Sequence, residues 1–203
     1  MGKITNAGLI LLASAQQTAG VNAALTYVAI GTGCGTLASA LASGTPYTTL
    51  ALDAGLPADL ADNTALLLTD GTNTQAVTVN GAALTGATSI TVDSFTPSAN
   101  FAAHTTGVVP SPVASALTLF NETVRVGVSA SVAGATAGES LTSGYFDGTQ
   151  ATAVYLEVGY FGGATASSAL ASGTLVGIDT AYWNHVVNVD TNMFQADSLI
   201  AAA

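Results

Sequence analysis

The sequence predicts a mainly β protein: an antiparallel β-sandwich with one short N-terminal helix and a small inserted β-module. Three observations favour this fold class. Apolar residues alternate with others at the period of a half-buried strand in 124–129 and again in 154–159. No strong helical pattern follows Pro110, and there is no heptad repeat. Between residues 50 and 108, short strand-like runs separated by turn residues indicate a separate β-module.

The composition excludes several classes of protein. Of 203 residues, 49% are hydrophobic and 7% are charged, which is too apolar for an intrinsically disordered protein. No apolar run reaches the ~18 residues of a membrane-spanning helix, so we expect no membrane insertion. Two basic residues against 12 acidic ones give a net charge of −10, so we expect no nucleic-acid binding.

The scarcity of charge also favours an assembly. Ordinary soluble domains carry roughly 25% charged residues, mostly at their surfaces. A surface with far fewer charges is tolerable when neighbouring subunits cover much of it. The composition is therefore typical of shells, fibres and surface layers rather than of free monomers.

The N-terminal segment is similar to a secretory signal, because a basic residue precedes the apolar run 9–13 and small residues follow it. This run is at the short limit for a signal, so we do not expect a secretory route. Residues 7–17 are instead predicted to form a helix, since Thr5 or Asn6 can accept hydrogen bonds from the free N–H groups of its first turn.

A strand is predicted at 25–30, closed by the glycine-rich turn 31–35. A dinucleotide-binding loop would need a glycine where Thr36 stands and a helix directly after it, so we interpret the segment as a tight turn. Cys34, the single cysteine, excludes an intramolecular disulfide and is interpreted as a packed thiol, not a nucleophile. A loop with a helical turn at 37–41 follows.

Residues 50–108 are predicted to be the inserted β-module, and residues 1–49 and 109–203 the sandwich scaffold. Asp70 and Gly71, between two β-prone runs, are a strong hairpin signal. The module's expected strands are 65–69, 75–79, 89–92 and 107–109, and those of the C-terminal part are 124–128, 154–158, 175–179 and 183–189. The module's aspartates are interpreted as turn-forming, because their spacing matches no calcium loop; they are Asp53, Asp59, Asp62 and Asp70.

No catalytic, cofactor-binding or metal site is predicted. His104 and His185 are the only histidines, and they lie in different predicted modules. The sequence has no Gly-x-Ser-x-Gly motif that would mark a nucleophilic serine for either of them. We interpret both as structural residues whose ring nitrogens form hydrogen bonds with nearby groups. The alternative class is an enzyme, for example a glycan-degrading one, which would need two close carboxylates in a cleft.

Glu122, Arg125 and Glu157 are the predicted structural and assembly residues. The only arginine lies on an alternating strand three residues from Glu122, and Glu157 lies on another such strand. A buried or interfacial arginine–carboxylate pair would fix strand register or subunit docking at a cost in desolvation. The alternative is an exposed pair, which contributes little.

Several short segments carry a resemblance to a known family. Residues 3–9 read Lys-Ile-Thr-Asn-Ala-Gly-Leu, and 25–33 end in Gly-Thr-Gly. Residues 119–125 contain Leu-x-Asn-Glu-x-x-Arg, and 157–163 read Glu-Val-Gly-Tyr-Phe-Gly-Gly. In content and order these segments resemble bacteriophage tail-fibre and tail-collar-type proteins. Relative to that pattern, residues 50–108 are an insertion.

The resemblance implies a structural component of a bacteriophage virion, in a tail appendage, baseplate or collar, acting by oligomeric assembly and not by catalysis. A capsid (head) decoration or cement protein is one alternative, and a bacterial surface-layer or adhesin protein is another. The implied partners are copies of the chain itself, as a homotrimer, other virion proteins and a host-surface glycan. The implied location is the virion, assembled in the host cytoplasm. The scaffold would dock, and the inserted module would project outward.

Overall fold

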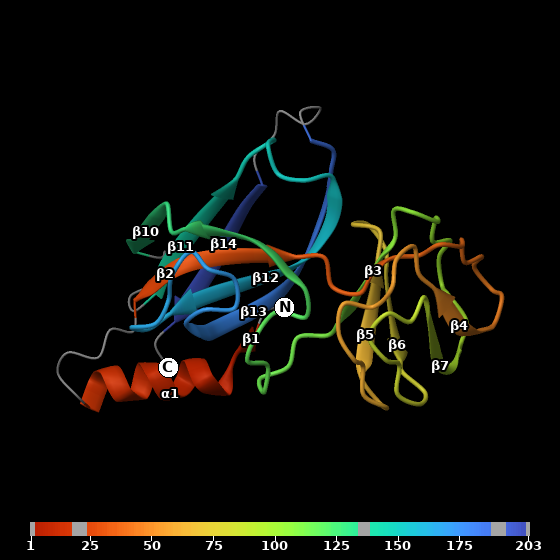
Figure 1. Ribbon diagram of the computed structural model, residues 1–203, viewed down its shortest axis with the longest axis horizontal. Coiled ribbons are helices and arrows are strands. Elements are labelled where there is room, and N and C mark those ends of the chain that lie inside the picture. Colours follow the sequence, from red (N-terminus) through yellow and green to blue (C-terminus); the bar gives the residue numbers. More distant parts are fainter. Residues whose placement is uncertain (1–2, 18–23, 134–138, 188–193, 202–203) are drawn as a thin grey trace.

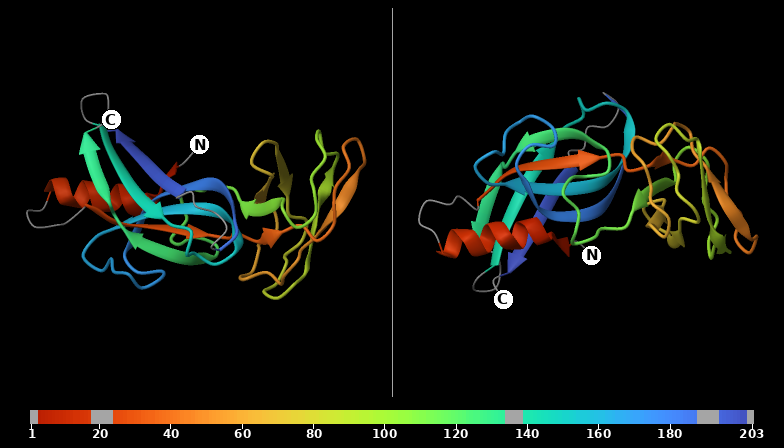
Figure 2. Two further views of the ribbon diagram at one scale, coloured as in Figure 1. Left: turned by 90° about the horizontal axis from the view of Figure 1, so that it is seen from above. Right: turned by 60° about the horizontal axis from the view of Figure 1, so that its bottom comes forward.

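The computed structural model describes residues 3–17, 24–133, 139–187 and 194–201. It is mainly β, with antiparallel sheets and one short helix, which confirms the predicted fold class. Two lobes lie side by side along the long axis: the sandwich scaffold with helix α1, and the inserted module (Figures 1 and 2).

The scaffold is a sandwich of two antiparallel sheets. The first sheet has the order β1 (Lys3–Ile4), β13 (Thr174–His185), β12 (Ala153–Gly162), β2 (Leu25–Gly31) and β9 (Glu122–Gly127). The second has the order β10 (Ala130–Ala133), β11 (Glu139–Phe146) and β14 (Phe194–Ala201). Phe146 of β11 packs with Val28, Val158 and Tyr160 of the first sheet, so the core lies between the sheets.

The opposite face of the first sheet carries a smaller cluster and helix α1 (Asn6–Gln17). Leu119 covers Phe161 and Leu175 there. The helix begins as predicted, because the Gly8 N–H donates to Thr5 Oγ1 at 2.9 Å. The Thr5 N–H donates to the Val176 carbonyl at 2.9 Å, which fixes the helix start against β13.

Strand β12 departs from the predicted alternation. The register shifts between Tyr155 and Glu157, where two residues of β13 oppose Leu156 alone. Tyr155 and Val158 therefore share the sandwich core, whereas Val154 and Leu156 pack with the module. The prediction that Val154, Leu156 and Val158 point the same way was wrong, because a bulge reverses the alternation.

Strand β13 also differs from the prediction of two strands, 175–179 and 183–189. It is continuous from Thr174 to His185, because its pairing with β12 resumes beyond the bulge. Residues 188 and 189 lie outside the described residues.

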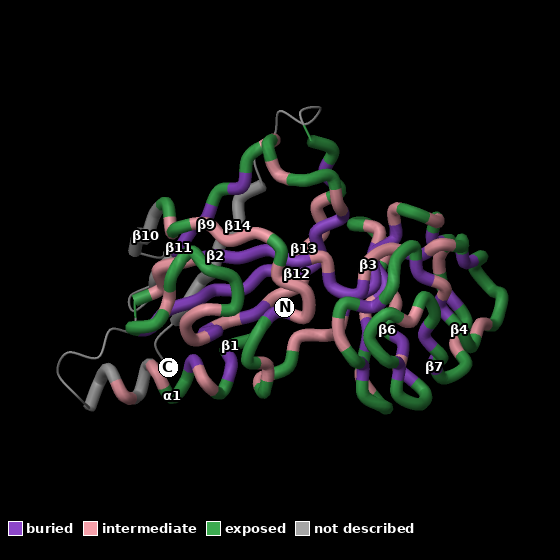
Figure 3. Tube along the Cα trace, viewed as in Figure 1, coloured by how far each residue is buried: buried purple, intermediate pink, exposed green. Residues whose placement is uncertain are grey.

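The module is built from two small antiparallel sheets. One has the order β3 (Gly35–Thr36), β8 (Gly107–Pro110), β5 (Ala65–Thr69) and β6 (Thr74–Thr78), and the other pairs β4 (Tyr47–Ala51) with β7 (Ser89–Phe95). Strands β5 and β6 form the hairpin predicted at Asp70 and Gly71. A separate apolar core fills the module. Buried stretches of the chain run along its strands in Figure 3.

The module begins earlier in the chain than residue 50. Residues 34–49, assigned to the scaffold from the sequence, pack in the module, because Cys34, Leu37 and Leu41 belong to its core. Leu37 and Leu41 form bridges with Leu52 and Phe101, so the helical turn predicted at 37–41 was wrong. Buried apolar contacts, not local helix propensity, determine the conformation of this segment.

Candidate functional site

Glu122 and Arg125 form a buried ion pair on the edge strand β9. Arg125 Nε donates to Glu122 Oε1 at 2.6 Å, and Nη2 donates to Oε2 at 2.9 Å. The arginine side chain is 0% exposed and the glutamate side chain 5%. This is the buried arginine–carboxylate pair expected from the sequence, in the two-bond geometry that suits a guanidinium.

The pair also holds the loop that joins β12 to β13. Arg125 Nη1 donates to the Ser172 carbonyl at 2.6 Å, and the Ala171 N–H donates to Glu122 Oε2 at 3.0 Å. The guanidinium carbon lies 3.8 Å from the centre of the Phe161 ring, a cation–π contact. One ion pair therefore links the edge strand β9, the β12–β13 loop and the Phe161 ring of β12, which lies two strands away in the sheet.

Glu157 does not join this pair. Its side chain is directed at the backbone instead: Oε1 accepts from the Phe120 N–H at 2.9 Å, and Oε2 accepts from the Asn121 and Gly33 N–H groups at 3.0 and 3.2 Å. The residue is 2% exposed. Three backbone donors offset part of the cost of burying a carboxylate, and through them Glu157 positions the backbone.

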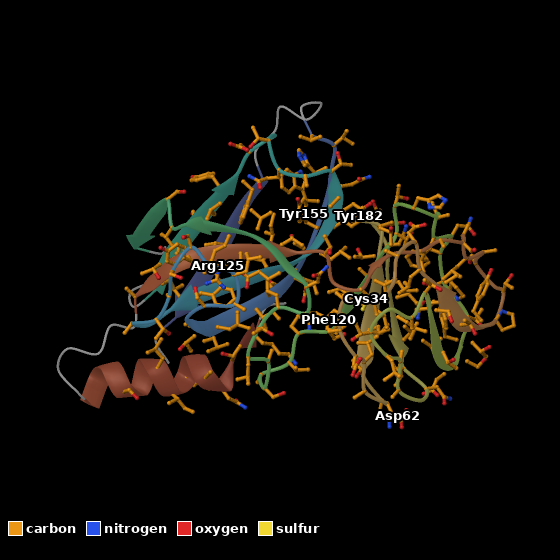
Figure 4. All side chains as sticks on the ribbon, viewed as in Figure 1. Cys34, Asp62, Phe120, Arg125, Tyr155 and Tyr182 are labelled. Carbon is orange, nitrogen blue, oxygen red and sulfur yellow. The ribbon has the colours of Figure 1, made fainter. Side chains whose placement is uncertain are left out.

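These donors come from the two crossings between scaffold and module. Gly33 lies where the chain leaves β2 for the module, and Phe120 and Asn121 lie where it returns to β9. Asn121 Nδ2 also donates to Thr32 Oγ1 at 2.7 Å. Figure 4 places Phe120 and Cys34 between the two lobes. Glu157 therefore fixes both crossings from one point.

The environment of Glu157 shifts its titration. Burial raises the pKa of Glu157 above its ordinary value, and the three backbone N–H groups oppose this by stabilising the carboxylate. The nearby Glu122 raises the pKa of Glu157 further. The net direction is upward, so burial exceeds the effect of the donors.

Apolar contacts complete the junction. Val109 of β8 packs against Val154 and Leu156 of β12. The Tyr182 hydroxyl donates to the Thr105 carbonyl at 2.8 Å. A Cβ atom at Gly107 would lie 2.7 Å from Leu156 Cδ1, so any larger residue at position 107 would force the Leu156 side chain to move.

The module's aspartates hold turns, as interpreted from the sequence. Asp59 Oδ1 accepts from the Thr85 N–H at 2.7 Å, and Asp62 Oδ1 accepts from the Gly81 N–H at 2.8 Å. Asp70 Oδ1 accepts from the Asn73 N–H at 2.6 Å. Within the described ranges, no three histidine, cysteine or acidic side chains gather in a way that could hold a metal ion.

Each histidine has a polar partner within hydrogen-bond distance, and the cysteine is buried. His104 Nδ1 lies 2.7 Å from Asp53 Oδ1 at an exposed turn, a pairing that the sequence did not indicate. His185 Nε2 lies 3.0 Å from the Gln150 carbonyl, and its ring lies 4.4 Å from that of Trp183. Burial raises the pKa of the Cys34 thiol well above its ordinary range, which disfavours the reactive thiolate.

Sequence reasoning identified Glu157 but missed its donors. An acidic residue inside the run Tyr155–Phe161 signals a buried carboxylate. Backbone N–H groups, in contrast, have no sequence signature, so Gly33, Phe120 and Asn121 could not be found this way. Tyr182 was missed because the bulge in β12 and β13 sets its direction.

Fold and site together define a class: an antiparallel β-sandwich with an inserted β-module, joined through a buried glutamate. No match was found when the chain was compared with protein-family models, curated proteins and solved structures. The helix in the described part of the chain lacks the length and apolarity to span a membrane.

Proposed function

We propose that the protein is a structural component of a bacteriophage virion, placed in a tail appendage, baseplate or collar, and that it acts by oligomeric assembly. One observation carries the proposal: the segments that resemble tail-fibre and tail-collar proteins meet in one buried network. Glu157, in segment 157–163, accepts hydrogen bonds from Gly33 in segment 25–33 and from Phe120 and Asn121 in segment 119–125.

Further contacts link the same segments. Arg125 in segment 119–125 lies over the Phe161 ring in segment 157–163. Strand β2 in segment 25–33 is hydrogen-bonded to both β12 and β9 in the sheet, which brings these three segments together. Their convergence supports the resemblance as a shared scaffold.

The carboxylates at this site support assembly over catalysis. The oxygens of Glu122 are occupied by Arg125 and by the Ala171 N–H, and those of Glu157 by backbone N–H groups. Both side chains are buried. A glycan-degrading pair would need to face a cleft that admits the sugar and a water.

The exposed turns of the module support a lobe that points outward. Five of the 12 acidic residues lie on the module: Asp53, Asp59, Asp62, Asp70 and Asp93. Asp59 and Asp62 face solvent and accept hydrogen bonds from the backbone N–H groups of Thr85 and Gly81 in other turns of the module. A lobe of this kind is stable in water, whereas the scaffold's arginine and Glu157 are buried.

Immunogold electron microscopy tests the proposal. Antibodies raised against the purified protein are applied to phage particles and host cells from a culture that expresses the gene. We expect gold at the tail, baseplate or collar. Gold confined to the capsid would replace this proposal with head decoration, and gold on the cell envelope with a surface-layer or adhesin role. Particles without gold would overturn a virion role.

A further inference from the structure

The turn that follows strand β6 holds an asparagine–glycine pair, Asn80 and Gly81. Asn80 is the only asparagine of the chain that is followed by a glycine. Both residues are exposed, and Gly81 has a φ of 78°, in the left-handed region that favours glycine. Figure 4 shows Asp62, which is hydrogen-bonded to this turn, at the lower end of the module.

Two carboxylates hold the nitrogen atoms of this pair. The Gly81 N–H donates to Asp62 Oδ1 at 2.8 Å. Asn80 Nδ2 donates to Asp93 Oδ1 at 2.9 Å. The Asn80 N–H donates to the Thr91 carbonyl at 2.9 Å, which fixes the start of the turn against β7. A group that can accept a proton therefore lies directly on the amide of Gly81.

The pair has the groups that are needed for an asparagine to lose ammonia. The backbone nitrogen of the next residue can attack the side-chain carbonyl carbon Cγ and close a five-membered succinimide ring. A Cβ atom on that next residue hinders the closure, and Gly81 has none. A carboxylate within hydrogen-bond distance of the attacking N–H can act as a general base.

We propose that Asn80 is a deamidation site at which Asp62 accepts the proton of the Gly81 amide. The Gly81 nitrogen gives its proton to Asp62 Oδ1 and forms a bond to Asn80 Cγ. The bond from Cγ to Nδ2 breaks, and Nδ2 leaves as ammonia with the proton that Asp62 returns. Water then opens the ring at one of its two carbonyl carbons, which leaves aspartate or isoaspartate at position 80. The proposal does not depend on a virion role.

Deamidation to aspartate would replace a hydrogen bond by a repulsion. Position 80 would present an oxygen in place of Nδ2 to Asp93 Oδ1, and neither carboxylate can donate a hydrogen bond. Like charges that face each other across neighbouring strands destabilise the pairing. Asp62 is a third carboxylate at the same turn. The modified turn is therefore less firmly held to β7, and the chain gains one negative charge.

Peptide mapping by mass spectrometry tests the site. The purified wild type and the variant Asp62→Asn are incubated at neutral pH, and the exchange of NH₂ for OH is followed at each asparagine. The variant keeps a side-chain oxygen for the Gly81 N–H but lacks the basic carboxylate. We expect position 80 to convert about tenfold more slowly in the variant than in the wild type. Circular dichroism verifies that both are folded.

Asn63 is a matched control within the same chain. It is also exposed, and its Nδ2 donates to Asp62 Oδ2 at 2.9 Å. It is followed by Thr64, whose N–H donates to the Ala61 carbonyl and not to a carboxylate. We expect Asn80 to convert at least about tenfold faster than Asn63. In guanidinium chloride, which abolishes the contact with Asp62, the wild type and Asp62→Asn should convert at equal rates at position 80.

Thermal melting tests the consequence for the turn. Asn80→Asp is expected to melt at a lower temperature than the wild type. In Asn80→Asp/Asp93→Asn the donor and the acceptor exchange places, so this double variant should recover most of the loss. Equal melting of Asn80→Asp and the wild type would show that deamidation does not loosen the turn.

Two outcomes would overturn the proposal itself. If Asn80 converts no faster than Asn63 in the folded protein, Asn80 is not a deamidation site. If folded Asp62→Asn converts as fast as the wild type, or faster, Asp62 is not the proton acceptor, and faster conversion would show that it protects the turn.

Discussion

The guanidinium of Arg125 is held on several sides by groups of its own fold. Glu122 takes two of its hydrogen bonds, the Ser172 carbonyl takes another, and the Phe161 ring lies against its face. Both charged side chains are shielded from solvent, so each depends on the other to balance its charge. Removing the arginine would leave a buried carboxylate without its cation.

Arg125→Ala is therefore expected to lower the free energy of unfolding by about 3–5 kcal/mol. Urea denaturation followed by circular dichroism measures this change. The control is the double variant Glu122→Gln/Arg125→Met, which removes both charges and is expected to lose less than Arg125→Ala. Equal midpoints for Arg125→Ala and the wild type would show that the pair does not stabilise the fold.

Glu157 is expected to give stability a pH dependence of unusual sign. Burial raises the pKa of Glu157 above its ordinary value of 4.5, so the folded state binds this proton more readily than the unfolded state. Its contribution is fully present below the unfolded pKa and is lost as pH rises through the folded pKa. The stability of the wild type relative to Glu157→Gln should therefore fall as pH rises above the ordinary pKa of 4.5 and through the raised pKa of the folded state.

Asp59 supplies a control of opposite sign. Hydrogen bonds from the Thr85 backbone and hydroxyl hold the pKa of Asp59 below its ordinary value of 3.8. Its contribution is present above that value and is lost as pH falls through the folded pKa. The stability of the wild type relative to Asp59→Asn should thus fall towards acid pH. Urea unfolding over the same buffers measures both, and parallel curves would contradict the assignment of Glu157.

At the scale of single residues, some hydrogen-bond and ion-pair partners could be predicted from the sequence and others could not. The Glu122–Arg125 pair was predicted because the chain has no other arginine. Residues three apart in a regular strand face opposite sides, but the register shift between Ile30 and Gly31 gives β9 an extra residue after Glu122 and brings the two side chains to one side. The Asp53–His104 pair was not predicted, since its members are 51 residues apart. The donors to Glu157 are backbone groups, and any residue type can supply them.

At the scale of elements, locally determined features were predicted well. The first turn of α1 follows from the hydroxyl of Thr5, and the β5–β6 hairpin follows from Asp70 and Gly71. Both depend on neighbours within a few residues. The alternation of β9 was also predicted correctly, because Val124 and Val126 pack on the sandwich core while Arg125 lies on the other face.

Features set by a distant strand were predicted poorly. The pairing of β12 with β13 shifts register at Leu156, where Tyr155 packs in the sandwich core and Leu156 packs against the module. Neither partner is visible from the local pattern. The same reason explains 37–41, whose leucines pair with Leu52 and Phe101 across the module.

At the scale of the whole molecule, two cores meet through a small junction. The module has its own core of buried residues, and the sandwich has another. The junction consists of the Glu157 hydrogen bonds, the Val109 cluster and the Tyr182 hydroxyl. The lobes are thus stabilised mainly from within, as expected for an inserted unit.

This arrangement predicts that the module can be removed if the deletion takes out all of the module core and leaves the sandwich core intact. Gly35 and Val108 are direct partners in the antiparallel pair of β3 and β8, so their Cα atoms lie about 5 Å apart. Deleting residues 36–107 and joining the ends with a short glycine turn should leave a folded scaffold that still enters particles. Deleting only 52–108 should fail, because Leu37, Leu41 and Leu50 would lose their core.

Solubility, circular dichroism and immunogold labelling of both variants test this. If the shorter deletion folds and the longer one aggregates, the module begins near residue 50 and the packing of 34–49 does not define its edge.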